Sequence, residues 1–137
     1  MVITYGTRMS GTRFNNGRRV IEKWNDVFSV LDAEPRRQIV TSLLDADGSV
    51  PLPESAVNPN ASPDPKELRL ELYHKHLPVL AEHGFIEWEA DPFVAERGPR
   101  FGEVAIVFEA LYTHVESIPD SLVIGCQRLE REREMTT

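Results

Sequence analysis

Three histidines, His74, His76 and His83, lie close together in the sequence, and histidine is a common metal ligand. On a helix, His74 and His76 point about 200° apart. His76 and His83 share a helix face, but about 10 Å of helix rise separates them. Because no pair can reach one ion without distortion, we expect packed or surface histidines and no metal site.

The other side chains able to carry out chemistry follow no catalytic pattern. Cys126 is the single cysteine, so it forms neither an internal disulfide nor a zinc knuckle and is expected to pack as a small apolar residue. The sequence contains no Ser/His/Asp arrangement typical of a catalytic triad, no paired-carboxylate signature and no glycine-rich phosphate-binding loop. We therefore expect neither an enzyme nor a cofactor.

Charge is unevenly distributed along the 137 residues. The 22 acidic residues outnumber the 15 basic ones, and the formal net charge is −7. Only three basic residues are lysines, and an acid-rich, lysine-poor surface is typical of proteins that work in high salt. Residues 1–19 hold four cations and no acid, which predicts a basic arm in front of an acidic body; these cations are Arg8, Arg13, Arg18 and Arg19.

From its hydropathy pattern, we expect the protein to be cytoplasmic. No apolar run reaches the roughly 20 residues that span a bilayer, and Glu109 interrupts the best candidate, residues 104–111. The N-terminus lacks the apolar segment of a secretory signal. Met9 offers a second possible start of the chain.

Apolar spacing predicts two helices in the first third of the chain. Residues 1–18 have no apolar period and predict a flexible arm. From Val20 onward, apolar residues recur at three- and four-residue steps, which predicts an amphipathic helix. A second helix is expected after the N-cap Asp32, with Pro35 in its first turn and Gly48 at its end.

A proline-rich segment and a third long helix follow. Five of the ten prolines lie within residues 51–65, which favours a short strand near Val50, one helical turn and a loop. Asp64 and Pro65 form a cap-and-first-turn pair for the third helix, and Gly84 ends it.

The rest of the chain predicts a β-hairpin and two further helices. Residues 85–89 and 93–96 alternate apolar and polar side chains, with a turn at residues 90–92. Apolar spacing then predicts helices over residues 102–116 and 120–134.

The third helix and the strand after it resemble those of arsenic-repressor-type winged-helix regulators. The regulators' His-Leu-x-x-Leu-x-x-x-Gly-Leu-Ile pattern is matched by His76, Leu77, Leu80, Gly84, Phe85 and Ile86. The two leucines would face the core, and the glycine supplies the left-handed helix end. The chain is also similar to small haloarchaeal winged-helix proteins, over residues 31–40, 74–78, 98–101 and 118–123.

This resemblance implies an α+β fold with a winged helix-turn-helix domain over residues 19–101. It also implies C-terminal helices over residues 102–137 that form a dimer. The expected function is that of a transcriptional regulator which binds double-stranded DNA as a homodimer. The apolar stripe expected at the dimer interface comprises Val107, Leu111, Leu122 and Ile124.

If DNA is bound, we expect eight side chains to contact it in addition to the N-terminal arm. His74 is polar and not permanently charged, so it is the candidate for a base edge, and the cations are expected on phosphates. The eight residues are Lys66, Arg69, His74, Lys75, Arg36, Arg37, Arg97 and Arg100.

Four of these arginines have an alternative interpretation. Arg36 and Arg37 also suit a solvated helix face. Arg97 and Arg100 also suit ion pairs with the neighbouring acids, Glu96 or Glu103.

A helical wheel at 100° per residue gives the third helix an exposed face of mixed charge. Two predicted contacts, Lys66 and Arg69, fall within its apolar arc. Since acids repel phosphate, this face supports an alternative function, a protein-interaction winged-helix module that does not bind DNA. The acids on the face are Glu67, Glu71 and Glu82.

Overall fold

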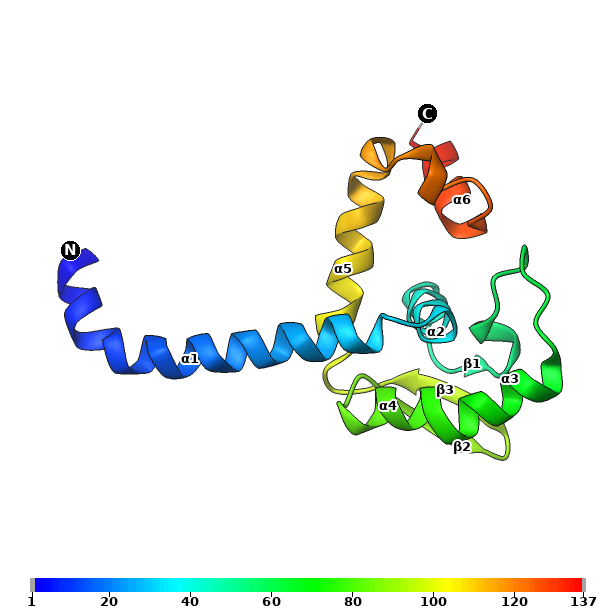
Figure 1. The fold of residues 1–137 in the computed structure, drawn as a ribbon, viewed down its shortest axis with the longest axis horizontal. Helices are drawn as coiled ribbons and strands as arrows, with labels where there is room; N and C mark the ends of the chain where they lie inside the picture. The colour runs from blue at the N-terminus through cyan, green and yellow to red at the C-terminus, as the bar shows by residue number, and fades with distance from the viewer. Residues whose placement is uncertain (1, 137) are drawn as a thin grey trace.

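The structure is a computed structural model that describes the backbone of residues 2–136 and the side chains of residues 15–136. It is an α+β fold in which a small antiparallel sheet lies at the edge of a mostly helical body, and one long helix projects from that body (Figure 1). No helix in the described part of the chain has both the length and the hydropathy needed to cross a membrane.

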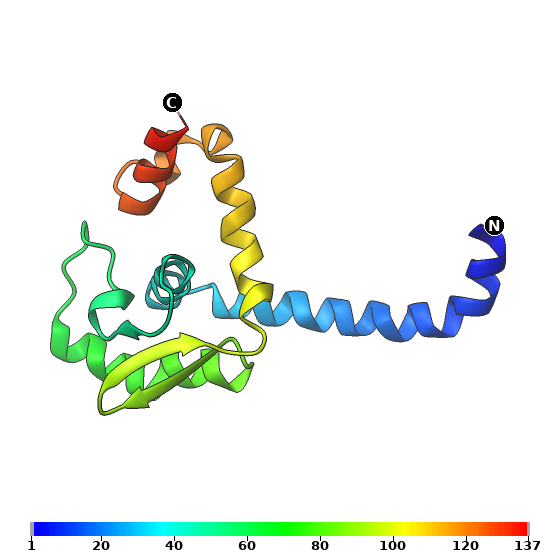
Figure 2. The same cartoon turned by 180° about the vertical axis from the view of Figure 1, so that it is seen from behind.

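Helix α1, Val2–Val30, forms the projection and packs on the body through its C-terminal end (Figures 1 and 2). Val27 and Val30 are buried there. The backbone is thus helical across residues 2–18, where the sequence predicted an arm without regular structure. No proline precedes Pro35, so no residue of this segment forces the helix to end.

The basic residues of the predicted arm lie on both sides of the described limit. Arg18 and Arg19 are exposed on α1. The side chains of Arg8 and Arg13 lie outside the described residues.

Helix α2, Glu34–Asp45, lies at the centre of the body and has Pro35 in its first turn, as predicted. Its N-cap is Ala33, which makes no side-chain cap, so the predicted cap at Asp32 is wrong. The fully buried side chains of α2 are Ile39, Val40 and Leu43.

The sheet contains three short antiparallel strands in the order β1-β3-β2. Strands β2, Ile86–Ala90, and β3, Phe93–Arg97, form the predicted hairpin, in which Ala90 pairs with Phe93. Strand β1, Val50–Pro51, pairs with β3 at its other edge. The predicted helical turn follows β1 as a 3-10 helix, η1, Glu54–Ala56.

The third helix is continuous but irregular. It comprises α3, Pro65–Glu71, a π-helical turn η2, Leu72–His76, and α4, Leu77–Glu82. The carboxylate of Asp64 accepts the backbone N–H of Lys66 and caps the helix as predicted. At the other end Gly84 has φ 78°, the left-handed conformation that glycine adopts without strain.

Pro78 gives the π-turn a physical reason. Proline has no N–H, and its ring clashes with the carbonyl four residues earlier in a regular α-helix. The wider turn adds one residue and so rotates the first part of the helix by about 100°. Leu68 therefore faces the core together with Leu77 and Leu80, whereas Leu70 is 60% exposed.

Helix α5, Phe101–Thr113, belongs to the same hydrophobic core as α2 and the sheet. Its buried side chains include Phe101, Val104 and Phe108. Before it, Gly98 lies so close to the Gly84 carbonyl that an added Cβ would stand 2.5 Å from that oxygen. A glycine is required at this crossing.

The C-terminal segment turns back onto α2. The sequence predicted one helix over residues 120–134, and this prediction is wrong. The segment instead forms a 3-10 turn, η4, Asp120–Leu122, and a separate helix, α6, Gln127–Met135. Gly125, with φ 99°, lies between them. A further 3-10 turn, η3, Val115–Ser117, follows α5.

Candidate nucleic-acid interface

Four of the eight predicted contacts share an exposed stretch of the third helix. Lys66, Arg69, His74 and Lys75 all have exposed side chains. The side chains of Lys66, His74 and Lys75 make no hydrogen bond or ion pair with any described residue; it is the backbone N–H of Lys66 that donates to Asp64. The guanidinium of Arg69 lies 4.6 Å from the ring centroid of Phe93 on strand β3, which ties the helix to the hairpin.

The surface around these residues is of mixed charge. Glu67, Glu71 and Glu82 are exposed, as the helical wheel predicted. The wheel is wrong for Lys66 and Arg69, because the π-turn rotates both out of the apolar arc. The same rotation exposes Leu70, an apolar contact candidate that the sequence pattern placed in the core.

Arg36 is buried, so its guanidinium is not free to meet a phosphate. Its Nε donates to the Val30 carbonyl at 2.6 Å, and one Nη donates to the Ser29 carbonyl at 3.4 Å. The other Nη lies 2.9 Å from Nδ1 of the buried His76. The predicted phosphate contact and the alternative of a solvated face are therefore both wrong for Arg36.

The partners of His76 determine which ring nitrogen carries its proton. A guanidinium can only donate, so Nδ1 accepts from Arg36, and Nε2–H donates to Glu71 Oε1 at 3.3 Å. Burial lowers the pKa of His76, the Arg36 and Lys75 charges act in the same direction, and Glu71 partly offsets them. The ring is neutral and joins α2 to the third helix.

Acidification is expected to weaken the fold through His76. Its pKa is lower in the folded chain than its ordinary value of 6.5, so the unfolded chain binds more protons below that pH. The free energy of unfolding should therefore decrease as the pH falls from about 7 to about 5. Urea unfolding at both pH values measures this change.

The His76→Asn variant keeps an acceptor for Arg36 and does not titrate, so part of the pH dependence should disappear. The His74→Asn variant removes an exposed histidine and should retain the full dependence. Equal pH dependence in the native chain and the His76→Asn variant would contradict the prediction.

Arg37 and Arg97 each satisfy carbonyls at a helix end. Arg37 donates to the Leu31 carbonyl at 2.7 Å, just beyond α1, and pairs with Glu34 at 3.3 Å. Arg97 donates to the Leu43 carbonyl at 2.8 and 3.1 Å, near the end of α2. Both arginines are occupied with structural contacts, and for Arg97 these are carbonyls rather than the acids expected from the sequence.

Arg100 makes the ion pair that the sequence predicted. It lies 2.8 Å from Glu103 and 3.4 Å from Asp26 on α1, and the hydrogen bond to Glu103 is the main cause of its raised pKa. Asp26 also lies 3.6 Å from Nδ1 of His83. This cluster attaches α1 to the ends of the third helix and the hairpin.

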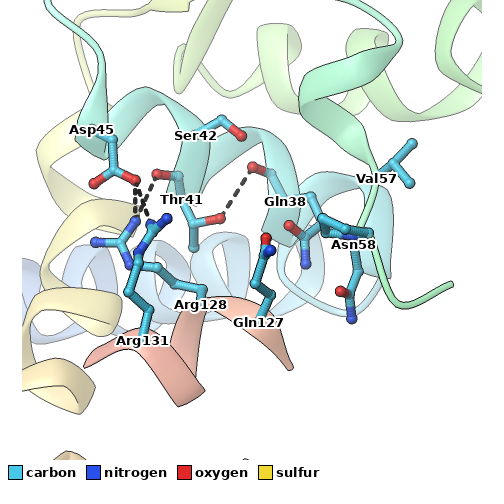
Figure 3. A pocket seen from close by; sticks show the side chains of 10 residues that line it. Gln38, Thr41, Ser42, Asp45, Val57, Asn58, Gln127, Arg128 and Arg131 are labelled. Atoms are coloured by element: carbon cyan, nitrogen blue, oxygen red, sulfur yellow. Dashed lines mark hydrogen bonds and ion pairs between the residues drawn. The ribbon is translucent and has the colours of Figure 1, made fainter. Parts of the chain in front are cut away.

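A polar cleft of about 200 Å³ lies between α2 and α6 (Figure 3). Asp45 of α2 pairs there with Arg128 and Arg131 of α6. The ring of Tyr112 lies 4.3 Å from the Arg128 guanidinium. This contact between α2 and α6 could not be predicted from the sequence, because the two arginines occur in an alternating run of charges that suits a solvated helix.

No group of three or more His, Cys, Asp or Glu side chains in the described part of the chain could hold a metal ion. His74 is exposed, whereas His76 is buried against Arg36. No match to this chain is found among protein-family models, curated proteins or solved structures.

Proposed function

We propose that this protein is a DNA-binding transcriptional regulator whose third helix enters the major groove. The observation that carries the proposal is the exposed set of Lys66, Arg69, His74 and Lys75 on a helix followed directly by a β-hairpin. An α-helix fits the major groove, and lysine and arginine neutralise phosphates.

The order of the elements supports a winged-helix domain. Helix α2, strand β1, turn η1, the third helix and the β2–β3 hairpin follow one another, and the hairpin lies beside the third helix (Figure 2). The short turn η1 takes the place of the middle helix, and the hairpin is the wing. Its tip is acidic, at Glu89 and Asp91, so the wing is expected to avoid phosphates.

Within the third helix, the proposal assigns different tasks to neighbouring side chains. Lys66, Arg69 and Lys75 are the phosphate contacts, and His74 is the base-edge contact. Leu70 lies among them and suits apolar contact with a thymine methyl group.

Replacing Lys75 by Ala is expected to weaken binding to all duplex sequences about equally. Loss of one phosphate contact should lower the slope of log K against log salt by about one. The measurement is fluorescence anisotropy of labelled duplexes over a salt series. Lys23→Ala is the matched control, because Lys23 lies on α1 and pairs with Glu103 at 4.0 Å.

His74→Ala should instead change the preference among duplex sequences. If Lys75→Ala and Lys23→Ala have the same effect, the third helix does not meet the phosphates.

The exposed acids favour a second candidate function, the protein-interaction module. Changing Glu67 and Glu71 to Gln should strengthen DNA binding if this face approaches phosphate. If no variant binds DNA and the double substitution abolishes binding to a protein partner, the interaction module is the correct function.

We also propose a homodimer through residues 102–137. Leu122 and Ile124 are 65% and 73% exposed, respectively, and dimerisation would cover them. Light scattering should report a dimer for the full chain and a monomer for the double variant Leu122→Asp, Ile124→Asp.

A comparison variant tests another exposed apolar surface, on α1. Trp24 is 48% and Phe28 is 61% exposed. If Trp24→Asp with Phe28→Asp gives the monomer while the C-terminal variant stays dimeric, the interface lies on α1 and the predicted one is wrong.

A further inference from the structure

A cleft of about 420 Å³ lies between the start of α2, the loop after η1 and the first turns of α3. Part of its wall is apolar, with contributions from Pro35, Val57 and Leu68. Leu68 is buried, and the other two are partly buried. The cleft falls in the size range of small-molecule sites, whose apolar walls bind the apolar part of a ligand.

The polar part of the cleft has a single sign of charge. Four carboxylate side chains line it, and none of its described lining residues is a lysine, arginine or histidine. Three of them accept a hydrogen bond from elsewhere in the chain, whereas Glu67 has no described partner. The four residues are Glu34, Asp64, Glu67 and Glu71.

These two properties restrict the chemistry of a ligand. An anion would meet four carboxylates and no cation, and a neutral apolar molecule would leave the carboxylates unused. A bare metal ion would gain nothing from the apolar wall. An ammonium group on an apolar body fits both parts of the surface.

We propose that this cleft binds a small amphipathic organic cation, with its apolar body against Leu68 and Val57 and its ammonium groups at the carboxylates. The carboxylates come from two sides, since Glu34 lies on α2, whereas Asp64, Glu67 and Glu71 belong to α3 and its cap. A ligand with an ammonium group at each end of an alkyl chain can reach both sides. The proposal does not depend on DNA binding.

The probe is α,ω-diaminooctane, titrated into the full chain by calorimetry at low ionic strength. One diamine per chain should bind. Octanediol, which has the same length and no charge, should bind at least about tenfold more weakly, and octanedioate should not bind. Ethylenediamine, which has both charges but almost no apolar body, should also bind at least about tenfold more weakly.

Two substitutions make the test specific to the cleft. Glu67→Gln should weaken diamine binding about three- to fivefold, as expected for one exposed charge contact. Glu89→Gln removes the same charge from the hairpin, outside the lining of the cleft, and should leave binding unchanged. Because both side chains are exposed, neither substitution should impair folding.

Four results would overturn the proposal. Equal binding of octanediol would show an apolar pocket without cation selectivity, and equal binding of ethylenediamine would show attraction to charge alone. Equal weakening by Glu67→Gln and Glu89→Gln would show a general effect of net charge. Displacement of the diamine by a peptide of residues 1–19 would identify the chain's own basic segment as the occupant.

Discussion

Leu80→Ala is expected to lower the free energy of unfolding by about 2–5 kcal/mol, the range for emptying a buried leucine site. Leu80 is fully buried in the core that also contains Ile39 and Leu43 of α2. The side chain joins the third helix to the centre of the body, where neighbouring atoms cannot close a cavity without moving the helix. Urea unfolding at neutral pH measures the change.

Leu70→Ala provides the matched control, because the same atoms are removed from the same helix. Leu70 is exposed, so its loss should change the free energy of unfolding by no more than about 0.5 kcal/mol. Equal losses at Leu70 and Leu80 would show that the helix does not bury the face described.

Arg36→Met is expected to lower the free energy of unfolding by about 2–4 kcal/mol. Methionine fills much of the space but leaves the Val30 carbonyl and Nδ1 of His76 without their donor. Each buried acceptor then keeps its desolvation cost without a hydrogen bond. Arg37→Met, at a more exposed neighbour, should cost less.

A double-mutant cycle separates the network from simple packing. Arg36→Met together with His76→Leu removes both partners, so its cost should be smaller than the sum of the two single costs. Additive costs would mean that the 2.9 Å contact between Arg36 and His76 contributes nothing to stability.

Local sequence signals predicted most of the elements near the candidate site. Asp64 and Gly84 mark the ends of the third helix because a side-chain cap and a left-handed residue act within a few residues. The hairpin follows from alternating apolar and polar residues for the same reason. These signals need no knowledge of distant contacts.

The direction of individual side chains was harder to predict. Arg36 and Arg37 are adjacent and chemically identical, and the one that turns inward depends on His76, forty positions later. The wheel assumed one helical period throughout, so it misplaced Lys66 and Arg69 once the π-turn changed that period. The sequence signal for the turn was available in Pro78, whose effect on the helix could have been anticipated.

The π-turn also affects how this chain should be compared with relatives. A relative with one residue fewer between Leu68 and Leu77 could form an unbroken α-helix with the same two leucines toward the core. A correct alignment would then need a gap within a helix, where gaps are normally disfavoured. Lys66 and Arg69 would correspond to residues one position away from those in an ungapped alignment, so the identity of the side chains on this exposed face depends on placing that gap.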